Sequence, residues 1–196
     1  MQFGGIELGG ALGGYEIINK PASTLPQDLA SAISVVNAGK LGATYDPLWL
    51  VGKQLVNGMN YLLICKQIRS TKNADTAIVG VIVNIPPGSI DGKGATAARI
   101  IEEEKLSPEL EAAFADAKQQ LRGVEYKAIL YMGSEVVHGV NHYIVCEAKN
   151  IYPGADPRPV ILGINICDNK VSITGVVPIK DPAQQAPGLF GYAFSW

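Results

Sequence analysis

The fold is decided by the stretch Gln54-Leu55-Val56-Asn57-Gly58-Met59-Asn60-Tyr61, which recurs 81 positions later as Glu135-Val136-Val137-His138-Gly139-Val140-Asn141-His142. A shift of 81 positions aligns residues 13–65 with residues 94–146 without a gap. The matched residues are mostly glycines at predicted turns and apolar residues at core-like spacing. Self-similarity at a fixed period is the signature of a duplicated structural unit. We therefore divide the chain into two repeats, residues 1–91 and residues 92–196.

Composition narrows the classes of protein to which the chain can belong. It has 196 residues, of which 47% are hydrophobic and 17% are charged, as in ordinary globular proteins. It contains no apolar run near the roughly 20 residues that a membrane span needs. The formal charge is -2, and lysines and arginines do not cluster. Because phosphate backbones and anionic lipids are bound by such clusters, we expect neither nucleic acid nor membrane as a partner.

The N-terminal stretch and the cysteines bear on localisation. Residues 1–18 are apolar but contain six glycines and Glu7, and they lack the basic region of a secretory signal. We interpret them as a flexible arm and expect a cytoplasmic protein. Three cysteines, an odd number, fit a reducing compartment. Cys65 and Cys146 are equivalent in the two repeats, which favours core packing, and a disulfide between Cys146 and Cys167 is the weaker alternative.

Each repeat has the signals of one helix. In the first, Thr24 and Gln27 form a capping-box pattern, and Gly39 is expected to supply a left-handed stop. In the second, Ser107 caps, Pro108 takes the first helical position and Gly123 follows the helix. Between these signals, apolar residues recur at helical spacing: Leu29, Ala32, Ile33 and Val36 in repeat 1, and Leu110, Ala113, Phe114, Ala117 and Leu121 in repeat 2.

After each helix the chain becomes rich in strand-forming residues. Asn57-Gly58 and His138-Gly139 separate long apolar runs and predict hairpins, since such turns demand the positive φ that Asn and Gly tolerate. Asp168-Asn169 predicts a further turn. The predicted strands are residues 45–56, 59–68 and 76–85 in repeat 1, and 159–167 and 170–179 in repeat 2. The expected class is α+β, with one helix packed on an antiparallel sheet in each repeat.

Repeat 1 is one strand short, because Pro86-Pro87-Gly88 leads directly into a glycine-rich linker that ends at Gly94. The C-terminal tail is a candidate for the missing strand. Its aromatic residues alternate with small ones at strand period: Phe190, Tyr192, Phe194 and Trp196. A free aromatic strand would promote aggregation. We therefore expect the tail to pack against repeat 1 or against a second subunit in a homo-oligomer.

The motif resembles that of a known family. Residues 54–58 match the Q-x-V-x-G hairpin of the cystatins, inhibitors of papain-like cysteine proteases, and Asn60-Tyr61 matches the N-Y that usually follows. Leu12-Gly13-Gly14, Pro21 and the helix that comes next are similar to the arm and helix of the stefin branch. The resemblance implies two cystatin-like units and, as partner, a papain-like cysteine protease.

In that family an arm, a first hairpin and a second loop form a wedge that blocks the protease cleft. The resemblance assigns Leu12 to an apolar pocket of the protease and Gly13, with Gly14 beside it, to the passage near the catalytic cysteine. The central hairpin would be Gln54, Leu55, Val56, Asn57 and Gly58. Pro86 and Pro87 would form the second loop, which lacks the tryptophan of many secreted members. A wedge needs a rigid tip and an adaptable arm, which an Asn-Gly hairpin and a glycine-rich arm provide.

The second repeat departs from the motif. Glu135 replaces the glutamine, His138 stands in the turn, and Asp168-Asn169-Lys170 has no proline. For Val137 and Gly139, the needs of folding are a sufficient explanation. We therefore assign inhibition mainly to repeat 1.

Other chemistry is poorly supported by the sequence. Glu135, His138 and His142 flank a hairpin turn and are not spaced as metal ligands on a helix. No serine or cysteine is placed to form a nucleophilic site with either histidine. We expect no enzyme, metal or cofactor. Two alternatives to protease inhibition remain: a non-inhibitory scaffold module of the same fold, and an inhibitor similar to the latexin-like tandem cystatins, which block metallocarboxypeptidases through a surface between their units.

Overall fold

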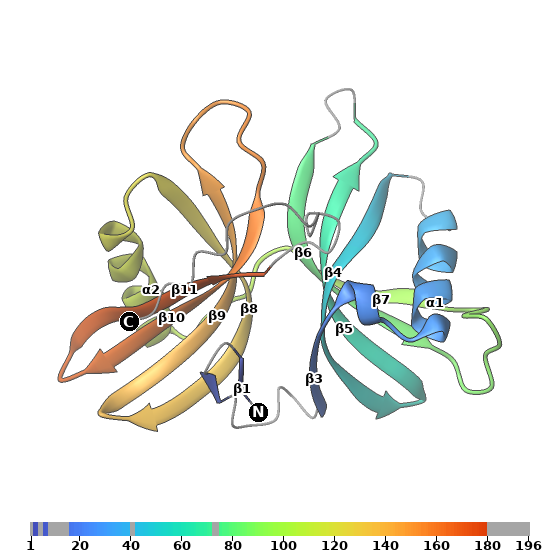
Figure 1. The fold of residues 1–196 in the computed structure, drawn as a ribbon, viewed down its shortest axis with the longest axis horizontal. Coiled ribbons are helices and arrows are strands. Elements are labelled where there is room, and N and C mark those ends of the chain that lie inside the picture. Colours follow the sequence, from blue (N-terminus) through green and yellow to red (C-terminus); the bar gives the residue numbers. More distant parts are fainter. Residues whose placement is uncertain (1, 4–5, 8–15, 40–41, 72–74, 180–196) are drawn as a thin grey trace, which may run out of the picture.

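The computed structural model describes residues 2–3, 6–7, 16–39, 42–71 and 75–179. The chain forms four layers, in which helix α1 and a five-stranded sheet face a four-stranded sheet and helix α2 (Figure 1). The sheets meet in the middle and the helices cover their outer faces. Every strand pair is antiparallel. The predicted α+β class, with one helix and one antiparallel sheet in each unit, is confirmed.

The first unit contains the five-stranded sheet in the order β3-β4-β5-β6-β7. Helix α1 buries the side chains that the helical spacing predicted, from Leu29 to Val36, against one face of this sheet. A short 3-10 turn, η1, precedes the helix. The bounds of the elements are β3 (Glu16–Pro21), η1 (Ala22–Thr24), α1 (Gln27–Ala38), β4 (Ala43–Val56), β5 (Gly58–Arg69), β6 (Thr76–Ile85) and β7 (Thr96–Ile101).

The second unit contains the four-stranded sheet in the order β11-β10-β9-β8. Helix α2 buries Leu110, Ala113, Phe114 and Ala117 against it. Its elements are α2 (Pro108–Gln120), β8 (Val124–Val137), β9 (Gly139–Asn150), β10 (Arg158–Cys167) and β11 (Lys170–Pro178). Two short strands, β1 (Gln2–Phe3) and β2 (Ile6–Glu7), pair with each other apart from both sheets.

The residues at the ends of α1 and α2 can be compared with the predicted helix caps. In α2 the prediction is confirmed, since Ser107 Oγ accepts from the Leu110 N–H at 3.3 Å and Pro108 is the first helical residue. In α1 it is wrong. The helix is capped by Pro26, and the Thr24 hydroxyl donates instead to the Pro21 carbonyl at 2.9 Å within η1. Gly39 ends the helix with φ -83° and is not left-handed.

The strand that repeat 1 lacks is supplied by repeat 2. β7 lies beyond the boundary at residue 91, yet it pairs with β6, from Gly80 opposite Ile101 to Asn84 opposite Thr96. The 81-residue shift superimposes β3 on residues 97–102, so β7 is the counterpart of β3. The two equivalent strands therefore lie on opposite edges of the same sheet. The aromatic tail, residues 180–196, lies outside the described residues.

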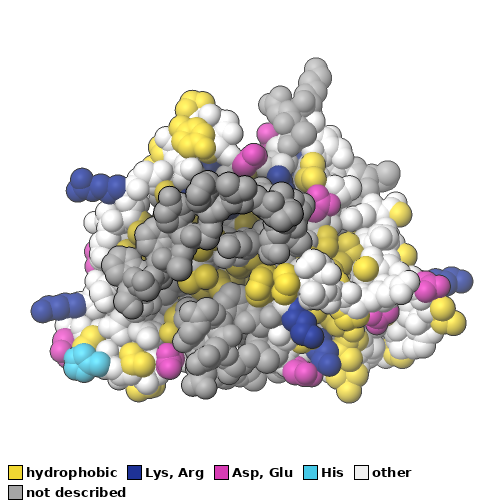
Figure 2. Space-filling view, viewed as in Figure 1, with side chains coloured by type: hydrophobic (Ala, Val, Ile, Leu, Met, Phe, Trp, Pro, Cys, Tyr) yellow, Lys and Arg dark blue, Asp and Glu magenta, His cyan; other side chains and the backbone are white. Residues whose placement is uncertain are grey.

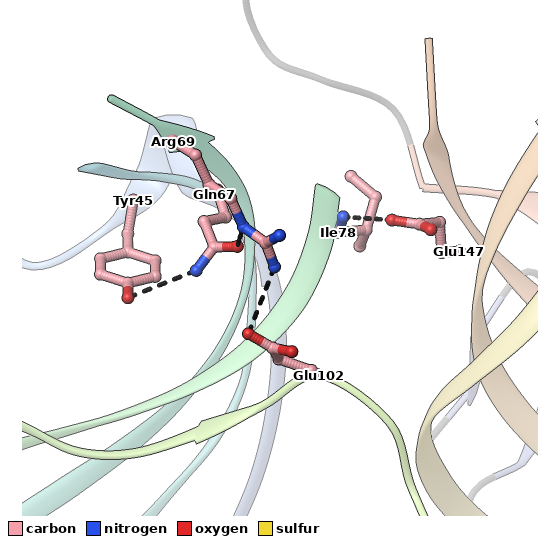
Figure 3. Close-up of polar contacts among 6 residues, drawn as sticks. All are labelled: Tyr45, Gln67, Arg69, Ile78, Glu102 and Glu147. Atoms are coloured by element: carbon pink, nitrogen blue, oxygen red, sulfur yellow. Dashed lines mark hydrogen bonds and ion pairs between the residues drawn. The ribbon is translucent and has the colours of Figure 1, made fainter. Parts of the chain in front are cut away.

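The sheets pack against each other through an apolar layer that we call the seam. Its buried side chains come from both units: Leu48, Val51, Leu62, Ile64, Ile78, Ile101, Leu130, Met132, Tyr143, Val145, Ile161 and Ile179. One charged side chain also bridges the units, because Glu147 Oε2 accepts from the backbone N–H of Ile78 at 2.6 Å (Figure 3). Figure 3 also shows Arg69 bound to Gln67 and to Glu102, which joins the end of β5 to the residue after β7.

We expect Glu147→Ala to lower the free energy of unfolding by about 1–3 kcal/mol, because the buried Ile78 N–H loses its acceptor. Glu147→Gln keeps an acceptor oxygen and should cost less. Lys66 occupies the equivalent position in repeat 1 and is a matched control, since Lys66→Ala should change stability by only about 0.5 kcal/mol. Urea unfolding of the three variants measures the difference. Equal losses for Glu147→Ala and Lys66→Ala would contradict the bridging role.

Candidate functional site

The residues assigned to the first hairpin and to the second loop meet at one end of the first sheet. Met59 is paired with Ile85, which places the β4–β5 turn beside the end of β6 and hence beside Pro86. The start of β3 is at the same end, where Glu16 pairs with Lys53 and forms an ion pair at 3.3 Å. Leu12, Gly13 and Gly14 lie outside the described residues. Of the three parts of the predicted wedge, the structure brings the hairpin and the second loop together.

The β4–β5 turn presents an apolar tip. Leu55 is 80% exposed and Val56 is 44% exposed, and Asn57 at the turn is also exposed. The hairpin projects at the lower right of Figure 1, and Figure 2 shows hydrophobic side chains along this lower edge of the molecule. Gln54 is half-buried and is paired with Asn60. The tip can therefore offer two apolar side chains to a partner without unfolding.

Glycine at position 58 is required by the fold. Its φ is +98°, and a Cβ atom there would overlap with the carbonyl oxygen of Ile85. Gly139 has φ +87°, and a Cβ there would overlap with Ile166 and Cys167. A positive φ was also expected at Asn57, but Asn57 does not have one. Among the described residues other than glycine, φ is positive at Asp91, Asp168 and Asn169. The close approach of the neighbouring strand thus accounts for the glycine in both repeats.

A hydrogen-bonded pair of asparagines stabilises each hairpin. These pairs were not predicted from the sequence. Asn84 Nδ2 donates to Asn60 Oδ1 at 2.8 Å, and Asn165 Nδ2 donates to Asn141 Oδ1 at the same distance. The signal was present, because the 81-residue shift also aligns Asn84 with Asn165. The asparagine of the motif therefore has a structural role, to tie the hairpin to the third strand.

The hairpin of repeat 2 has a tip of the same shape. Val136 is 83% exposed and Val137 is 46% exposed, close to the values of their counterparts Leu55 and Val56. The chemistry around it differs. Glu135 accepts a hydrogen bond from the Tyr143 hydroxyl at 3.1 Å, and the backbone carbonyl of His138 accepts from Asn165 at 3.2 Å. The contrast between the two repeats therefore lies in side chains and not in the exposure of the tips.

The second loop folds back toward helix α1. Pro86 is half-buried and Pro87 is exposed. Gly92 has φ +69° and lies so close to the backbone of Ala32 that a side chain would not fit. Further along, Ser89 Oγ donates to the Lys93 carbonyl at 2.8 Å. The loop is thus anchored to the helix, and its two prolines are held beside the hairpin.

No family model, curated protein or solved structure matches this chain. The described residues contain no cluster of three or more His, Cys, Asp or Glu side chains that could hold a metal ion. None of the helices in the described ranges is long and apolar enough to cross a membrane.

The cysteines are free. Cys146 is opposite Val160 in the β9–β10 ladder and not opposite Cys167, so the alternative disulfide does not form. Burial raises the pKa of the Cys65 thiol, and it raises that of Cys146 to about 12. Both thiols are therefore protonated near neutral pH and are poor nucleophiles.

His142 is held within the second unit. Its Nδ1 lies 2.9 Å from the Tyr131 hydroxyl. Burial lowers its pKa, and the charge of Glu109 partly offsets that shift. The ring is therefore mostly neutral at pH 7, and its Nδ1 is paired with the tyrosine hydroxyl.

Proposed function

We propose that the chain inhibits papain-like cysteine proteases by inserting the β4–β5 tip into the active-site cleft, with Pro86 and Pro87 beside it. The observation that carries the proposal is the exposed apolar pair Leu55 and Val56, held on a tight hairpin next to the end of β6. Inhibition would be steric, because the tip fills the cleft and is not cleaved productively. This role rests on the cystatin-like motif together with that geometry.

The rigidity of the β4–β5 tip lowers the entropic cost of binding. A flexible loop loses conformational entropy on binding, whereas a tip fixed by a hairpin and an adjacent strand has little left to lose. The Asn60–Asn84 hydrogen bond and the close contact of Gly58 with β6 hold this tip. Binding energy in such interfaces is concentrated in a few desolvated apolar side chains. Leu55, Val56 and Pro86 are the candidates among the described residues.

The decisive test uses the two equivalent tips. Leu55→Glu should weaken inhibition of papain by about 30-fold or more, because it places a charge in a desolvated apolar contact. Val136→Glu changes the counterpart, which is 83% exposed where Leu55 is 80% exposed. It should leave inhibition unchanged. Both side chains are on the surface, so circular dichroism should show the same fold in each variant. Loss of inhibition in both variants, or in neither, would refute the assignment to repeat 1.

Two further titrations separate the alternatives. A chain lacking Met1 to Gly13 should inhibit papain more weakly if the arm contributes to the wedge. A metallocarboxypeptidase should not be inhibited; inhibition of that enzyme alone would assign the protein to the other protease class.

The second candidate is a non-inhibitory scaffold module of the same fold. The observation that favours it is the near-identical exposure of the two tips, since an inhibitor that uses only repeat 1 has no need of a second apolar tip. In that function neither protease would be inhibited, and the tips would bind other proteins. Absence of inhibition by the unmodified chain would decide for this candidate.

A further inference from the structure

The hairpins β6–β7 and β10–β11 occupy equivalent places in the two sheets, but their connections differ. In the first unit, residues 86–95 join the strands, and this loop extends beside α1, where Gly92 contacts the backbone of Ala32 (Figure 1). In the second unit, Asp168 and Asn169 alone join the strands. Such a short turn cannot lie across a helix. The corresponding face of α2 is therefore left uncovered by the β10–β11 turn.

The exposure of equivalent residues shows the same difference. Ile85 at the end of β6 is only 8% exposed, whereas its counterpart Ile166 at the end of β10 is half-buried. Ser31 of α1 is half-buried, whereas its counterpart Ala112 of α2 is exposed. A surface that the loop covers in the first unit is thus open in the second.

The open surface is a groove of about 600 Å³ between α2 and the β10–β11 turn. On the sheet side it is lined by Ile166 and Val171. The Gln120 side chain donates to the Val171 carbonyl at 3.3 Å, which ties this wall to the helix. On the helix side the groove is lined by three alanines: Ala112, Ala113 and Ala115. The groove therefore has apolar walls and little side-chain bulk on its helical side.

The charges at the groove are negative. Glu109 and Asp116 both line it, about two helical turns apart on the same side of α2. Among the described residues that line the groove, none is basic. In the first unit the counterpart of Glu109 is Asp28, but the counterpart of Asp116 is Val35. The second unit thus favours a ligand with a lysine or arginine more strongly than the first.

The first unit shows what kind of segment fits this face of a helix. There the loop places Gly92, with φ +69°, so close to Ala32 that a side chain would not fit. Ala113, the counterpart of Ala32, lines the groove of the second unit. The same loop of a second copy is already packed on its own α1, so it is not the occupant.

We propose that the groove between α2 and the β10–β11 turn binds a loop of a partner protein that presents a glycine to Ala113 and a lysine or arginine to Asp116. The apolar walls provide contacts that exclude water, and the two carboxylates select a basic loop. The groove lies on the outer side of the second sheet and is separate from the β4–β5 tip. It does not depend on protease inhibition, and its test needs no protease.

A cyclic peptide made from the loop of the first unit serves as the probe. Asn84 and Thr96 are paired across β6 and β7, so a peptide that runs from one to the other can be closed by a two-residue turn. The loop is held by its own hydrogen bonds, including one from the Ala95 N–H to the Gly92 carbonyl at 2.9 Å. The peptide carries Asp91→Lys, which replaces its acidic residue with a basic one. Binding is followed by amide resonances of the isotope-labelled, unmodified protein.

We expect the lysine peptide to shift the amide resonances of Ala113, Ile166 and Val171. It should bind about five-fold more tightly than the peptide that keeps Asp91, because the reversed charge is attracted to two exposed carboxylates. A lysine peptide that also carries Gly92→Ala should bind about ten-fold more weakly, because a side chain has no room against the helix backbone.

Two variants of the protein locate the site with the same change of charge. Asp116→Lys lies at the groove and should weaken binding of the lysine peptide by about ten-fold. Glu111→Lys is the control, because Glu111 lies on the same helix but lines a different pocket, with Phe114 and Lys118. At physiological ionic strength, which screens distant charges, it should change binding by less than about two-fold. Asp116 and Glu111 are both exposed, and the amide spectra report whether each variant keeps its fold.

Equal effects of Asp116→Lys and Glu111→Lys would overturn the proposal. Amide shifts confined to residues outside the groove, or no shift at millimolar lysine peptide, would also overturn it, as would tighter binding of the peptide that keeps Asp91. A dimer of the unmodified chain joined through α2 would assign the groove to a second copy and would have the same consequence.

Discussion

Gly58→Ala and Gly139→Ala each lower the free energy of unfolding by about 3 kcal/mol. This loss adds the cost of holding alanine in a left-handed backbone conformation to the cost of relieving the steric overlap with the neighbouring strand. At both positions the added Cβ would meet backbone of the adjacent strand, at Ile85 in one case and at Ile166 in the other. Backbone cannot move aside as the end of a flexible side chain can. Urea unfolding measures both losses, and Gly175→Ala is a control, because a Cβ there meets open space.

The same positions separate the roles of folding and binding. Under the proposed function, Gly58→Glu abolishes protease inhibition and Gly139→Glu does not, although both variants are destabilised alike. The assay is made at a temperature at which both variants are folded. Equal inhibition by the two variants would show that the hairpin of repeat 1 has no special part in binding. Unchanged stability in both would contradict the close packing against β6 and β10.

Ile64→Ala should lower the free energy of unfolding by about 2–5 kcal/mol, because it leaves a cavity in the seam between the sheets. Ile64 is fully buried and packs with side chains from both units. Since neither sheet can cover its inner face without the other, we expect the units to unfold in a single transition before and after the change.

Hydrogen exchange of amides in β5 and β9 reports on each unit separately, and both sets should lose protection together. Ile90→Ala is the control, because Ile90 is 77% exposed and its truncation should cost only about 0.5 kcal/mol. Separate transitions for the two units would show that the seam does not couple them.

Much of the fold could be predicted because its signals are local. The apolar periodicity placed both helices, and the strand bounds 76–85 agree with β6 (Thr76–Ile85). Ser107-Pro108 gave the correct start of α2. Thr24 was misleading, because a hydroxyl that can cap a helix can equally close a preceding turn, and the choice depends on the backbone that follows. The proximity of the β4–β5 tip to Pro86 followed from consecutive hairpins, which bring alternate turns to the same end of a sheet.

Parts of the candidate site depended on contacts that no local pattern encodes. The need for Gly58 comes from Ile85, which is 27 positions away, and not from the turn alone. The partner of Asn60 is Asn84, 24 positions away on the neighbouring strand β6. Nothing in the hairpin sequences indicated that Val136 would be as exposed as Leu55, since exposure depends on what the rest of the chain covers.

The sequence by itself determined the duplication, the helix and hairpins of each repeat and the apolar faces that must be buried. Only the tertiary structure decided which edge each strand joins. A strand presents the same backbone donors and acceptors on both sides, so its local sequence does not select a neighbour. For β7 the choice is made by burial, because on β6 its Ile101 enters the seam between the sheets. That choice completes the first sheet.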